Sequence, residues 1–227
     1  MSVTVHKTLR LLILLVLFSA VGFVIWQRVQ PVQEPQPPFD PQWVRLSPAE
    51  IATLPVAERW DMPMGSELGA LTYNAQPFLT TRHLGDDLNG IGGYNSDLGD
   101  PVYAAALGRV VYAGVPSPGW GNVVILAHRV RDPVTKELEV IQSMYAHLLE
   151  SKVKVEQVVQ RGEVIGTVGT ADGRYLAHLH FELRRGPYVN PSTGYADAPL
   201  NRLSPERFIM ERRGAPLDVL NPAPIAK

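Results

Sequence analysis

The stretch HLHFEL, residues 178–183, decides both the fold and the place of the functional site. Side chains of a β-strand alternate between its two faces, so residues two apart share a face. His178, His180 and Glu182 are therefore expected on one side of a strand, and the three apolar side chains between and after them on the other. The apolar set suits a hydrophobic core, and the polar set suits the floor of a site.

Further short strands, punctuated by glycine or proline, precede this stretch. They are dense in β-branched and aromatic residues, which is typical of strands. They lie at residues 101–105, 108–114, 122–127, 140–145 and, with a turn at its start, 160–169. Long amphipathic helical stretches are missing from this region. We therefore predict a mainly β fold, a compact antiparallel β-sheet domain.

Short helices are expected on either side of this domain. Ser47-Pro48-Ala49-Glu50 places an N-cap serine, a first-turn proline and a capping-box glutamate in register. Ser204-Pro205-Glu206 opens a second helix, which we expect to reach about Arg213. The tail from Gly214 is rich in proline and is expected to be loose.

An almost wholly apolar run from Leu11 to Trp26 follows Lys7 and Arg10 and contains no charged residue. As a helix it would span about 24 Å, slightly less than a hydrocarbon core of about 30 Å. A cleaved signal peptide is one interpretation. The flanking basic residues, and Trp26 beside Arg28, favour an uncleaved signal anchor with the N-terminus inside. In both cases we expect the rest of the chain to be exported.

Charge and composition exclude several classes of protein. The 227 residues carry a net charge of −1 and the pI is near 6.6. These values give no reason to expect nucleic acid or a polybasic membrane surface as a partner. The chain has no cysteine, so it can form neither a disulfide framework nor a thiolate metal site.

Five residues of the second half of the chain form a candidate metal site: His83, Asp87, His147, His178 and His180. Two imidazoles and one carboxylate can hold a divalent metal and leave a coordination position open for water, as in catalytic zinc centres. The two remaining histidines would then be free for proton transfer. This set favours a hydrolase.

Several placements stay open at this stage. Strand periodicity puts Tyr145 on the same face as His147. His83 and Asp87 are expected in an irregular glycine-containing loop, where Asp86 is also a possible ligand. His128 is expected at the surface or behind the ligands.

Glu182 is either an acceptor for a ligand imidazole or a surface carboxylate. Residues 42–79, with Trp43, Trp60 and Tyr73, could pack on the domain or occlude its groove.

A series of motifs resembles the LytM/lysostaphin-type zinc metallopeptidases, which cleave peptide bonds in bacterial cell-wall peptidoglycan. In order, the motifs are His83-x-Gly85-x-Asp87, GDPVYA (99–104), GRVVYAG (108–114), GWGN (119–122), YAHL (145–148), GEVIGTVG (162–169) and HLHFE (178–182). The resemblance covers roughly residues 80–190, and it is the combination and order of the motifs that make it specific.

The resemblance implies roles for the five site residues. By it, His83, Asp87 and His180 bind Zn²⁺, while His147 and His178 form a catalytic pair beside the metal. It also selects Asp87 over Asp86. Two features depart from the pattern: the segment from residue 87 to 99 is longer than in short members, and residues 175–177 (YLA) replace a glycine-containing stretch. Both could reshape the substrate groove.

The resemblance and the N-terminal run together give an expected domain plan. Its parts are a signal anchor or transmembrane segment (1–29), a proline-rich linker (30–46), an N-terminal extension (47–79), the metallopeptidase domain (80–200) and a C-terminal helix with its tail (201–227). The expected location is the cytoplasmic membrane, crossed once, with the catalytic domain on the outer, periplasmic face.

The expected function is that of a zinc metalloendopeptidase acting on the stem peptides of peptidoglycan. The first alternative is a catalytically silent or autoinhibited cell-wall-binding regulator of another hydrolase, which would have a protein partner. A non-haem iron oxygenase shares the two-histidine, one-carboxylate set, but the extra histidines and export argue against it. A lipoyl-like carrier would need a lysine on the turn at residues 160–162, where the chain has none.

Overall fold

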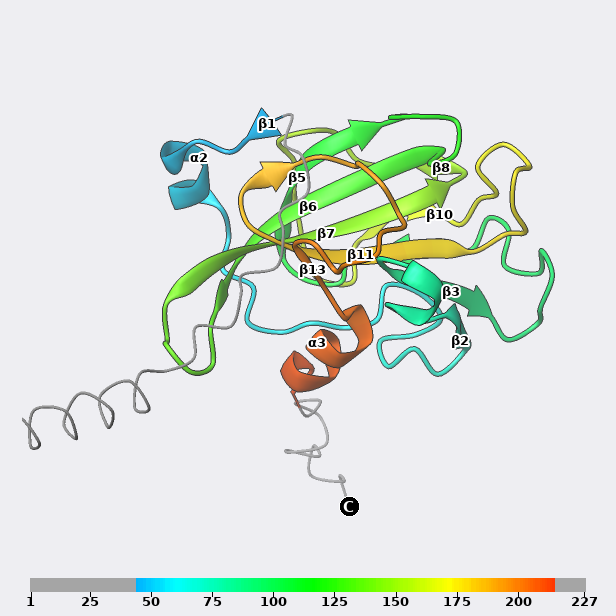
Figure 1. The fold of residues 1–227 in the computed structure, drawn as a ribbon, viewed down its shortest axis with the longest axis horizontal. Helices are drawn as coiled ribbons and strands as arrows, with labels where there is room; N and C mark the ends of the chain where they lie inside the picture. Colours follow the sequence, from blue (N-terminus) through cyan, green and yellow to red (C-terminus); the bar gives the residue numbers. More distant parts are fainter. Residues whose placement is uncertain (1–43, 215–227) are drawn as a thin grey trace, which may run out of the picture. The chain divides into compact units, whose positions relative to one another are not determined.

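The computed structural model describes residues 44–214 (Figure 1). The expected membrane anchor, most of the linker and the tail from residue 215 lie outside this range. The chain divides into two units, residues 1–36 and 37–227, and the fold described below is that of the second. Among residues 44–214, no helix has the length and apolar character needed to cross a membrane.

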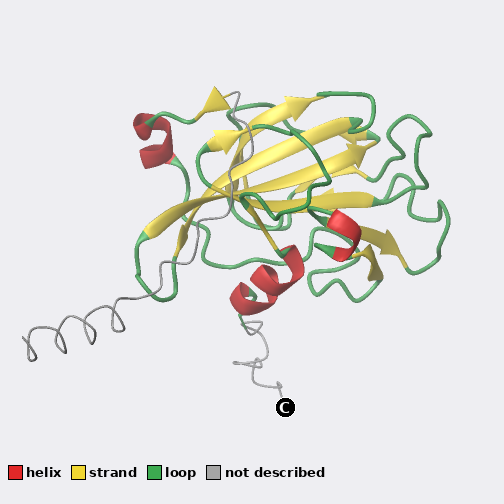
Figure 2. Cartoon of the chain, in the orientation of Figure 1, coloured by secondary structure: helices red, strands yellow, loops and turns green. Residues whose placement is uncertain are grey.

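Strands dominate the described residues, as Figure 2 shows in yellow, and the few helices are short. The strands are β1 (Val44–Arg45), β2 (Thr72–Gln76), β3 (Asp86–Gly90), β4 (Pro101–Tyr103), β5 (Gly108–Gly114), β6 (Asn122–Arg131), β7 (Leu138–Leu148), β8 (Glu150–Ser151), β9 (Val158–Val159), β10 (Val164–Thr167), β11 (Leu179–Arg185), β12 (Tyr188–Val189) and β13 (Arg202–Leu203). The helical segments are α2 (Pro48–Thr53), the 3₁₀ turn η1 (Thr80–Arg82) and α3 (Pro205–Arg212).

One large antiparallel sheet organises the fold. Its strand order is β2-β3-β11-β7-β6-β5-β9, and β13 also pairs with β11. A three-stranded sheet has the order β4-β10-β8, and β1 pairs with β12. All of these strand pairs are antiparallel. The predicted mainly β, antiparallel fold is therefore confirmed.

The two faces of the large sheet bury two different apolar clusters. One face carries Tyr145 and Phe181, which pack in the larger cluster together with Ile165 of the small sheet. The other face carries Met144 and Ala146, which pack with a second cluster. The predicted alternation in β11 is confirmed, because Leu179, Phe181 and Leu183 all belong to the larger cluster.

The helix predicted after Ser47 begins where its capping box indicates. The Glu50 backbone N–H donates to Ser47 Oγ at 3.2 Å, and the Ser47 N–H donates to Glu50 Oε2 at 2.6 Å. The second predicted helix is α3, but the side chain of Ser204 makes no capping bond. Instead Asp86 Oδ2 accepts from the Glu206 N–H at 3.0 Å, so a strand residue far away in the sequence caps this helix.

The segment before β2 packs on the sheet. Trp60 is fully buried in the larger cluster, where its ring contacts those of His128 and Phe208 at 4.7 and 5.1 Å. Leu54 is buried in the second cluster. Among the described residues before β2, none lines the groove that is described below. The described part of this segment therefore contributes core side chains and does not line the groove, while Trp43 lies outside the described residues.

Two expectations for individual residues are wrong. Asp87 lies within strand β3 and not in an irregular loop, because β3 pairs with β2 on one side and β11 on the other. His128 is fully buried, so it is not at the surface, and its hydrogen-bond partners are not the predicted ligands, so it is not behind them either. Its Nδ1–H donates to the Leu107 carbonyl at 2.7 Å, and its Nε2 lies 2.9 Å from Ser143 Oγ.

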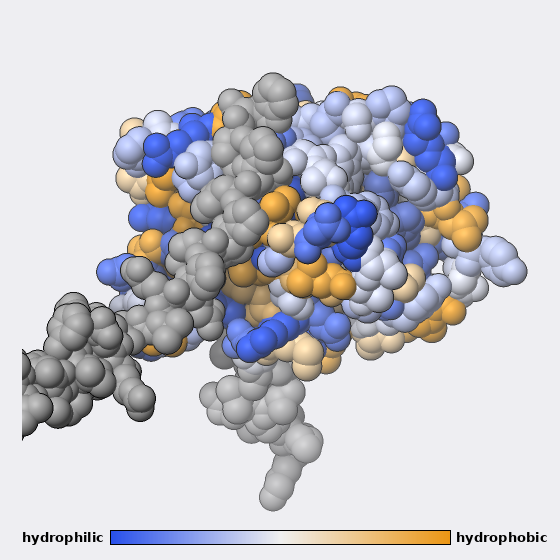
Figure 3. All heavy atoms as spheres, in the orientation of Figure 1, coloured by the Kyte–Doolittle hydropathy of each residue, from blue (hydrophilic) through white to orange (hydrophobic). Residues whose placement is uncertain are grey.

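On the face of the molecule shown in Figure 3, hydrophilic and apolar residues are interspersed in small patches. Such a mixed surface is ordinary for a near-neutral globular domain.

Candidate metal centre and active site

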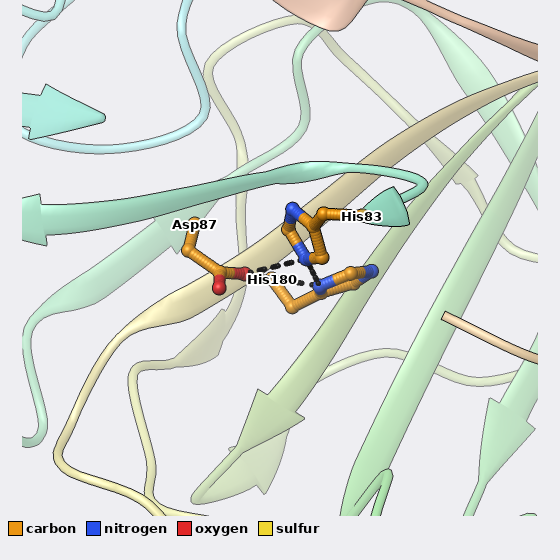
Figure 4. A group of neighbouring side chains, drawn as sticks. All are labelled: His83, Asp87 and His180. Carbon is orange, nitrogen blue, oxygen red and sulfur yellow. Dashed lines mark hydrogen bonds and ion pairs between the residues drawn. The ribbon is translucent and has the colours of Figure 1, made fainter. Parts of the chain in front are cut away.

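Strand pairing brings His83, Asp87 and His180 together. Asp87 of β3 lies directly opposite His180 of β11 in the antiparallel register. His83 stands just before β3 and forms an isolated bridge with Tyr195. Figure 4 shows the three side chains converging from these elements.

The atoms that meet are His83 Nε2, Asp87 Oδ1 and His180 Nδ1. The two nitrogens are 3.0 Å apart, and Asp87 Oδ1 lies 3.3 Å from the first and 3.0 Å from the second. Bonds of about 2.0–2.1 Å from a tetrahedral zinc ion would place its ligand atoms about 3.3 Å apart. The observed triangle is close to this size, so the three groups can hold a metal ion.

Neighbouring acceptors turn both imidazoles toward the triangle. The carbonyl of Gln76 accepts from His83 Nδ1–H at 3.0 Å, which leaves Nε2 to face Asp87. Glu182 Oε1 accepts from His180 Nε2–H at 2.9 Å, which leaves Nδ1 to face Asp87. Acceptors of this kind fix the tautomer of metal-binding histidines. The donor set therefore fits a divalent cation such as zinc.

Glu182 is fully buried behind His180. Its Oε2 accepts from Arg184 Nε at 2.8 Å and from Arg202 Nε at 3.1 Å. Of the two interpretations left open by the sequence, the surface carboxylate is wrong, and Glu182 is an acceptor for His180. A buried carboxylate without such partners would be very costly.

The carboxylates of Asp87 and Glu182 favour positive charge at the triad of His83, Asp87 and His180. Burial alone would raise the pKa of Asp87, but its hydrogen bonds to His180 and His83 hold that pKa well below its usual range. Burial would lower the pKa of His180, but Asp87 and Glu182 raise it to about 9. A bound cation would compete with the proton on His180, since metal ligands must be deprotonated.

His147 reaches the site because β7 departs from regular strand geometry there. Its φ of 62° lies in the left-handed region, and the register with β6 shifts between Asn122 and Val124. The irregularity turns His147 to the site, while Tyr145 stays in the core next to Phe181. The expectation that Tyr145 and His147 share a face is therefore wrong.

His147 and His178 lie side by side at one edge of the triad. Their ring centroids are 4.8 Å apart, and His178 Nε2 is 3.7 Å from Asp87 Oδ1. Backbone carbonyls hold both rings, because Trp120 O accepts from His147 Nδ1–H at 3.2 Å and Leu176 O from His178 Nδ1–H at 2.8 Å. Nε2 is thus the nitrogen of each ring that is left to exchange a proton with a ligand.

The pKa of His147 is lowered to about 3, first by its burial and then by the charges of His180 and His178. Its imidazole is therefore neutral at pH 7, so it can accept a proton.

All five residues line one groove with a volume of about 580 Å³. The other walls come from Gln76, Ser117, Gly119, Trp120, Tyr175 and residues 192–195. The structure thus brings together every side chain of the predicted site. Asp86 is excluded from it, because its Oδ1 accepts from the Phe78 N–H at 2.9 Å and its Oδ2 caps α3.

Trp120 and Gln76 were not expected at the site. Trp120 stacks on His147 at 5.9 Å between ring centroids, and Gln76 contributes a backbone carbonyl. The GWGN motif could have drawn attention to Trp120, whereas no sequence signal marks a carbonyl contact.

Known proteins with similar sequences indicate the family of this chain. The model of peptidase family M23 matches residues 89–191. Lipoprotein NlpD of Yersinia enterocolitica is 37% identical over 94 residues, which are 41% of this chain and 87% of that protein. The chain belongs to peptidase family M23. The resemblance found in the sequence is thereby confirmed at the level of the family.

Other relatives of this M23 chain are much longer than the matched region. Cell division protein DipM of Caulobacter vibrioides is 36% identical over 102 residues, 45% of this chain and 15% of that protein. Murein hydrolase activator NlpD of Escherichia coli K12 is 38% identical over 94 residues, 41% of this chain and 22% of that protein. Among solved structures, lysostaphin of Staphylococcus simulans gives a TM-score of 0.49 at 22% identity, over 75% of this chain and 62% of that one.

Proposed function

We propose that this M23 protein is a zinc-dependent endopeptidase that hydrolyses peptide cross-links of bacterial peptidoglycan. The observation that carries the proposal is the convergence of His83, Asp87 and His180 on one point, with two more histidines at its edge in the same groove. A structural zinc site closes all four positions, whereas this set supplies three protein ligands.

His83 Nε2, Asp87 Oδ1 and His180 Nδ1 would hold the zinc ion. A bound zinc ion supplies water with a pKa lowered to about 7 and polarises a carbonyl oxygen. The protein's own contribution is to fix this donor set, through Gln76 O and Glu182, and to place the scissile bond beside it.

His147 and His178 would move protons during amide hydrolysis. Because His147 is neutral, its Nε2 can accept a proton from the attacking water. His178, beside Asp87, can then stabilise the developing oxyanion or give a proton to the leaving amine. The division of these roles between the two rings is part of the proposal.

A second candidate function is activation of another cell-wall hydrolase. It is favoured by the names of relatives, several of which are called murein hydrolase activators. As an activator, the chain would bind a partner enzyme and need no turnover of its own.

The proposed location is the periplasmic face of the cytoplasmic membrane, with residues 1–29 as a single-pass anchor. Its support is the charge-free apolar run behind Lys7 and Arg10 in the sequence. Relatives named as lipoproteins are consistent with a place in the cell envelope.

Digestion of purified peptidoglycan by the full chain, with products resolved by mass, tests the proposal. We expect cross-linked dimers to disappear, the loss to stop on chelation and to return with added zinc. His147→Ala should still bind one zinc per chain and lose most turnover. Intact dimers despite one bound zinc per wild-type chain would favour the activator, and a near-wild-type rate for His147→Ala would remove that residue from the mechanism.

A further inference from the structure

Tyr175 is the first residue of the stretch that departs from the family pattern, and the proposed mechanism gives it no task. It lies in the loop between β10 and β11, residues 168–178, drawn in yellow at the right of Figure 1. The side chain lines the groove and is 47% exposed. A large, half-exposed aromatic residue at a proposed active site calls for an explanation in terms of the ligand.

The phenol ring of Tyr175 lies next to both His147 and His178 in the groove. Its centroid lies 4.8 Å from that of His147 and 5.9 Å from that of His178. Its hydroxyl is 3.7 Å from the place where a Cβ on Gly119 would stand. Tyr175 thus lies beside His147 with its hydroxyl directed toward Gly119.

The loop that carries Tyr175 is fixed by hydrogen bonds on both sides of it. Thr170 O accepts from the Tyr175 N–H at 3.1 Å, and Thr170 Oγ1 accepts from the Gly173 N–H at 2.9 Å. On the other side, Asn95 Oδ1 accepts from the Ala177 N–H at 2.7 Å. The position of the ring is therefore determined by the fold of the loop.

The groove residue toward which the Tyr175 hydroxyl is directed is a glycine. Gly119 has no side chain, and Trp120 behind it is held by a bond from its Nε1–H to Ser192 O at 2.7 Å. A ligand group beside His147 must therefore pack against the phenol ring of Tyr175. Apart from Asp87 and the histidines, the residues that line the groove are uncharged, so size and not charge is what this contact can select.

We propose that Tyr175 is a specificity-determining residue that limits the size of the substrate side chain next to the cleaved bond. The inference rests on the proposed function, and it names the residue that selects the substrate within that site. A small side chain fits beside the ring, whereas a branched one would have to displace the ring from His147. Replacing the phenol by a small group opens the groove at this point.

Peptide selectivity measures this effect. The probes are two synthetic stem peptides of one sequence that carry either alanine or leucine next to the cleaved bond, made for each side of that bond. Wild type should prefer alanine on the side that Tyr175 faces. In Tyr175→Ser, the ratio of kcat/KM for leucine over alanine should rise by about 10-fold or more, since methylene-sized differences in a pocket are worth roughly 10–200-fold.

Two matched variants separate size from general damage. Tyr175→Phe keeps the ring and should keep the wild-type ratio, while Tyr94→Ser makes the same replacement at a residue that is 84% exposed and outside the groove, and should change nothing. A loss of rate for both peptides in Tyr175→Ser, with their ratio unchanged on both sides of the bond, would overturn the inference.

Binding keeps the inference testable if the chain does not cleave. The dissociation constants of the same peptides are measured by calorimetry for wild type and Tyr175→Ser. Absence of cleavage by wild type would refute the proposed endopeptidase. A leucine-to-alanine ratio of dissociation constants that falls in Tyr175→Ser would still support the size limit, and an unchanged ratio would refute it.

Discussion

Replacing Glu182 by glutamine tests whether the carboxylate that accepts from His180 Nε2–H supports metal binding. The substitution keeps the size of the side chain and removes its charge. Glu182 is fully buried, and it joins His180 to Arg184 and Arg202 through bonds of 2.9, 2.8 and 3.1 Å. Every consequence of the change therefore passes through these three partners.

The first consequence concerns metal affinity. A glutamine amide is neutral, so it is a weaker acceptor for His180 Nε2–H, and its NH₂ group can face the ring instead. Loss of such an acceptor typically weakens metal binding by about 10–100-fold, which is about 1.4–2.8 kcal/mol. We expect zinc affinity, measured by competition with a fluorescent chelator, to fall within this range.

The second consequence concerns stability. Removing one partner of a buried ion pair costs about 3–5 kcal/mol, because the remaining charges stay buried without compensation. Part of this cost is avoided, since the amide oxygen can still accept from one arginine. We expect urea unfolding of the metal-free protein to show a loss of about 3 kcal/mol.

Two further variants separate the consequences. Glu182→Asp keeps the charge between the arginines and shortens the reach to His180, so zinc affinity should fall more than stability does. Glu139→Gln removes a partly exposed carboxylate that pairs with Arg185 at 2.9 Å. It should leave zinc affinity unchanged and shift stability by no more than about 0.5 kcal/mol. Zinc affinity equal to wild type in folded Glu182→Gln would refute the role of Glu182.

Substitutions of His128 and Gly169 give two further predictions, one for stability and one for activity. Burial lowers the pKa of His128 from 6.5 to about 4, so the buried neutral ring contributes about 3 kcal/mol of stability above pH 6.5, and this contribution should be lost as the pH falls to 4. Urea unfolding from pH 7 to 4 should show a smaller loss of stability for His128→Asn than for wild type. Equal dependence of the unfolding free energy on pH in the two proteins would contradict a role of His128 in the loss. In Gly169→Ala, the new Cβ would lie 2.4 Å from both His147 O and Leu149 N, so the backbone that positions His147 must shift. Peptidoglycan hydrolysis should therefore fall at least 10-fold. The control is Gly114→Ala, whose nearest contact would be at 3.4 Å and which should keep the wild-type rate.

Strand periodicity succeeded where a strand is regular and central. β11 pairs with β3 and with β7, and His180 and Phe181 are held in register from both sides. The separation of His180 and Glu182 from Leu179 and Phe181 could therefore be predicted from the sequence alone. The large sheet as a whole was predictable for the same reason.

Periodicity failed at His147, because the positive φ of this residue turns its side chain to the face opposite the one that alternation predicts. The cause is the register shift opposite Asn122 and Val124, and a bulge of this kind has no marker in a single sequence. The prediction for His128 failed because its two partners come from other segments: Leu107 O precedes β5, and Ser143 lies in β7. Contacts between distant segments decide the burial of a polar residue, and they cannot be read from its neighbours in the sequence.

Family membership and metal chemistry rest on different parts of this chain. The stretch matched by the family model, residues 89–191, includes His147, His178 and His180 but begins after His83 and Asp87. The match therefore cannot by itself distinguish a peptidase from an activator. Two of the three groups that can hold the metal lie outside it, and one of them, Asp87, meets His180 because β3 pairs with β11 in this register.

A shift of this pairing by one residue would turn Asp87 to the other face of the sheet, where Leu88 now belongs to the larger apolar cluster. The register is held by Leu88 in that core and by Asp86, whose carboxylate binds the Phe78 and Glu206 backbones at 2.9 and 3.0 Å. The residues on either side of Asp87 thus fix its direction. This local construction, and not the similarity to relatives, is the reason to expect chemistry at the site.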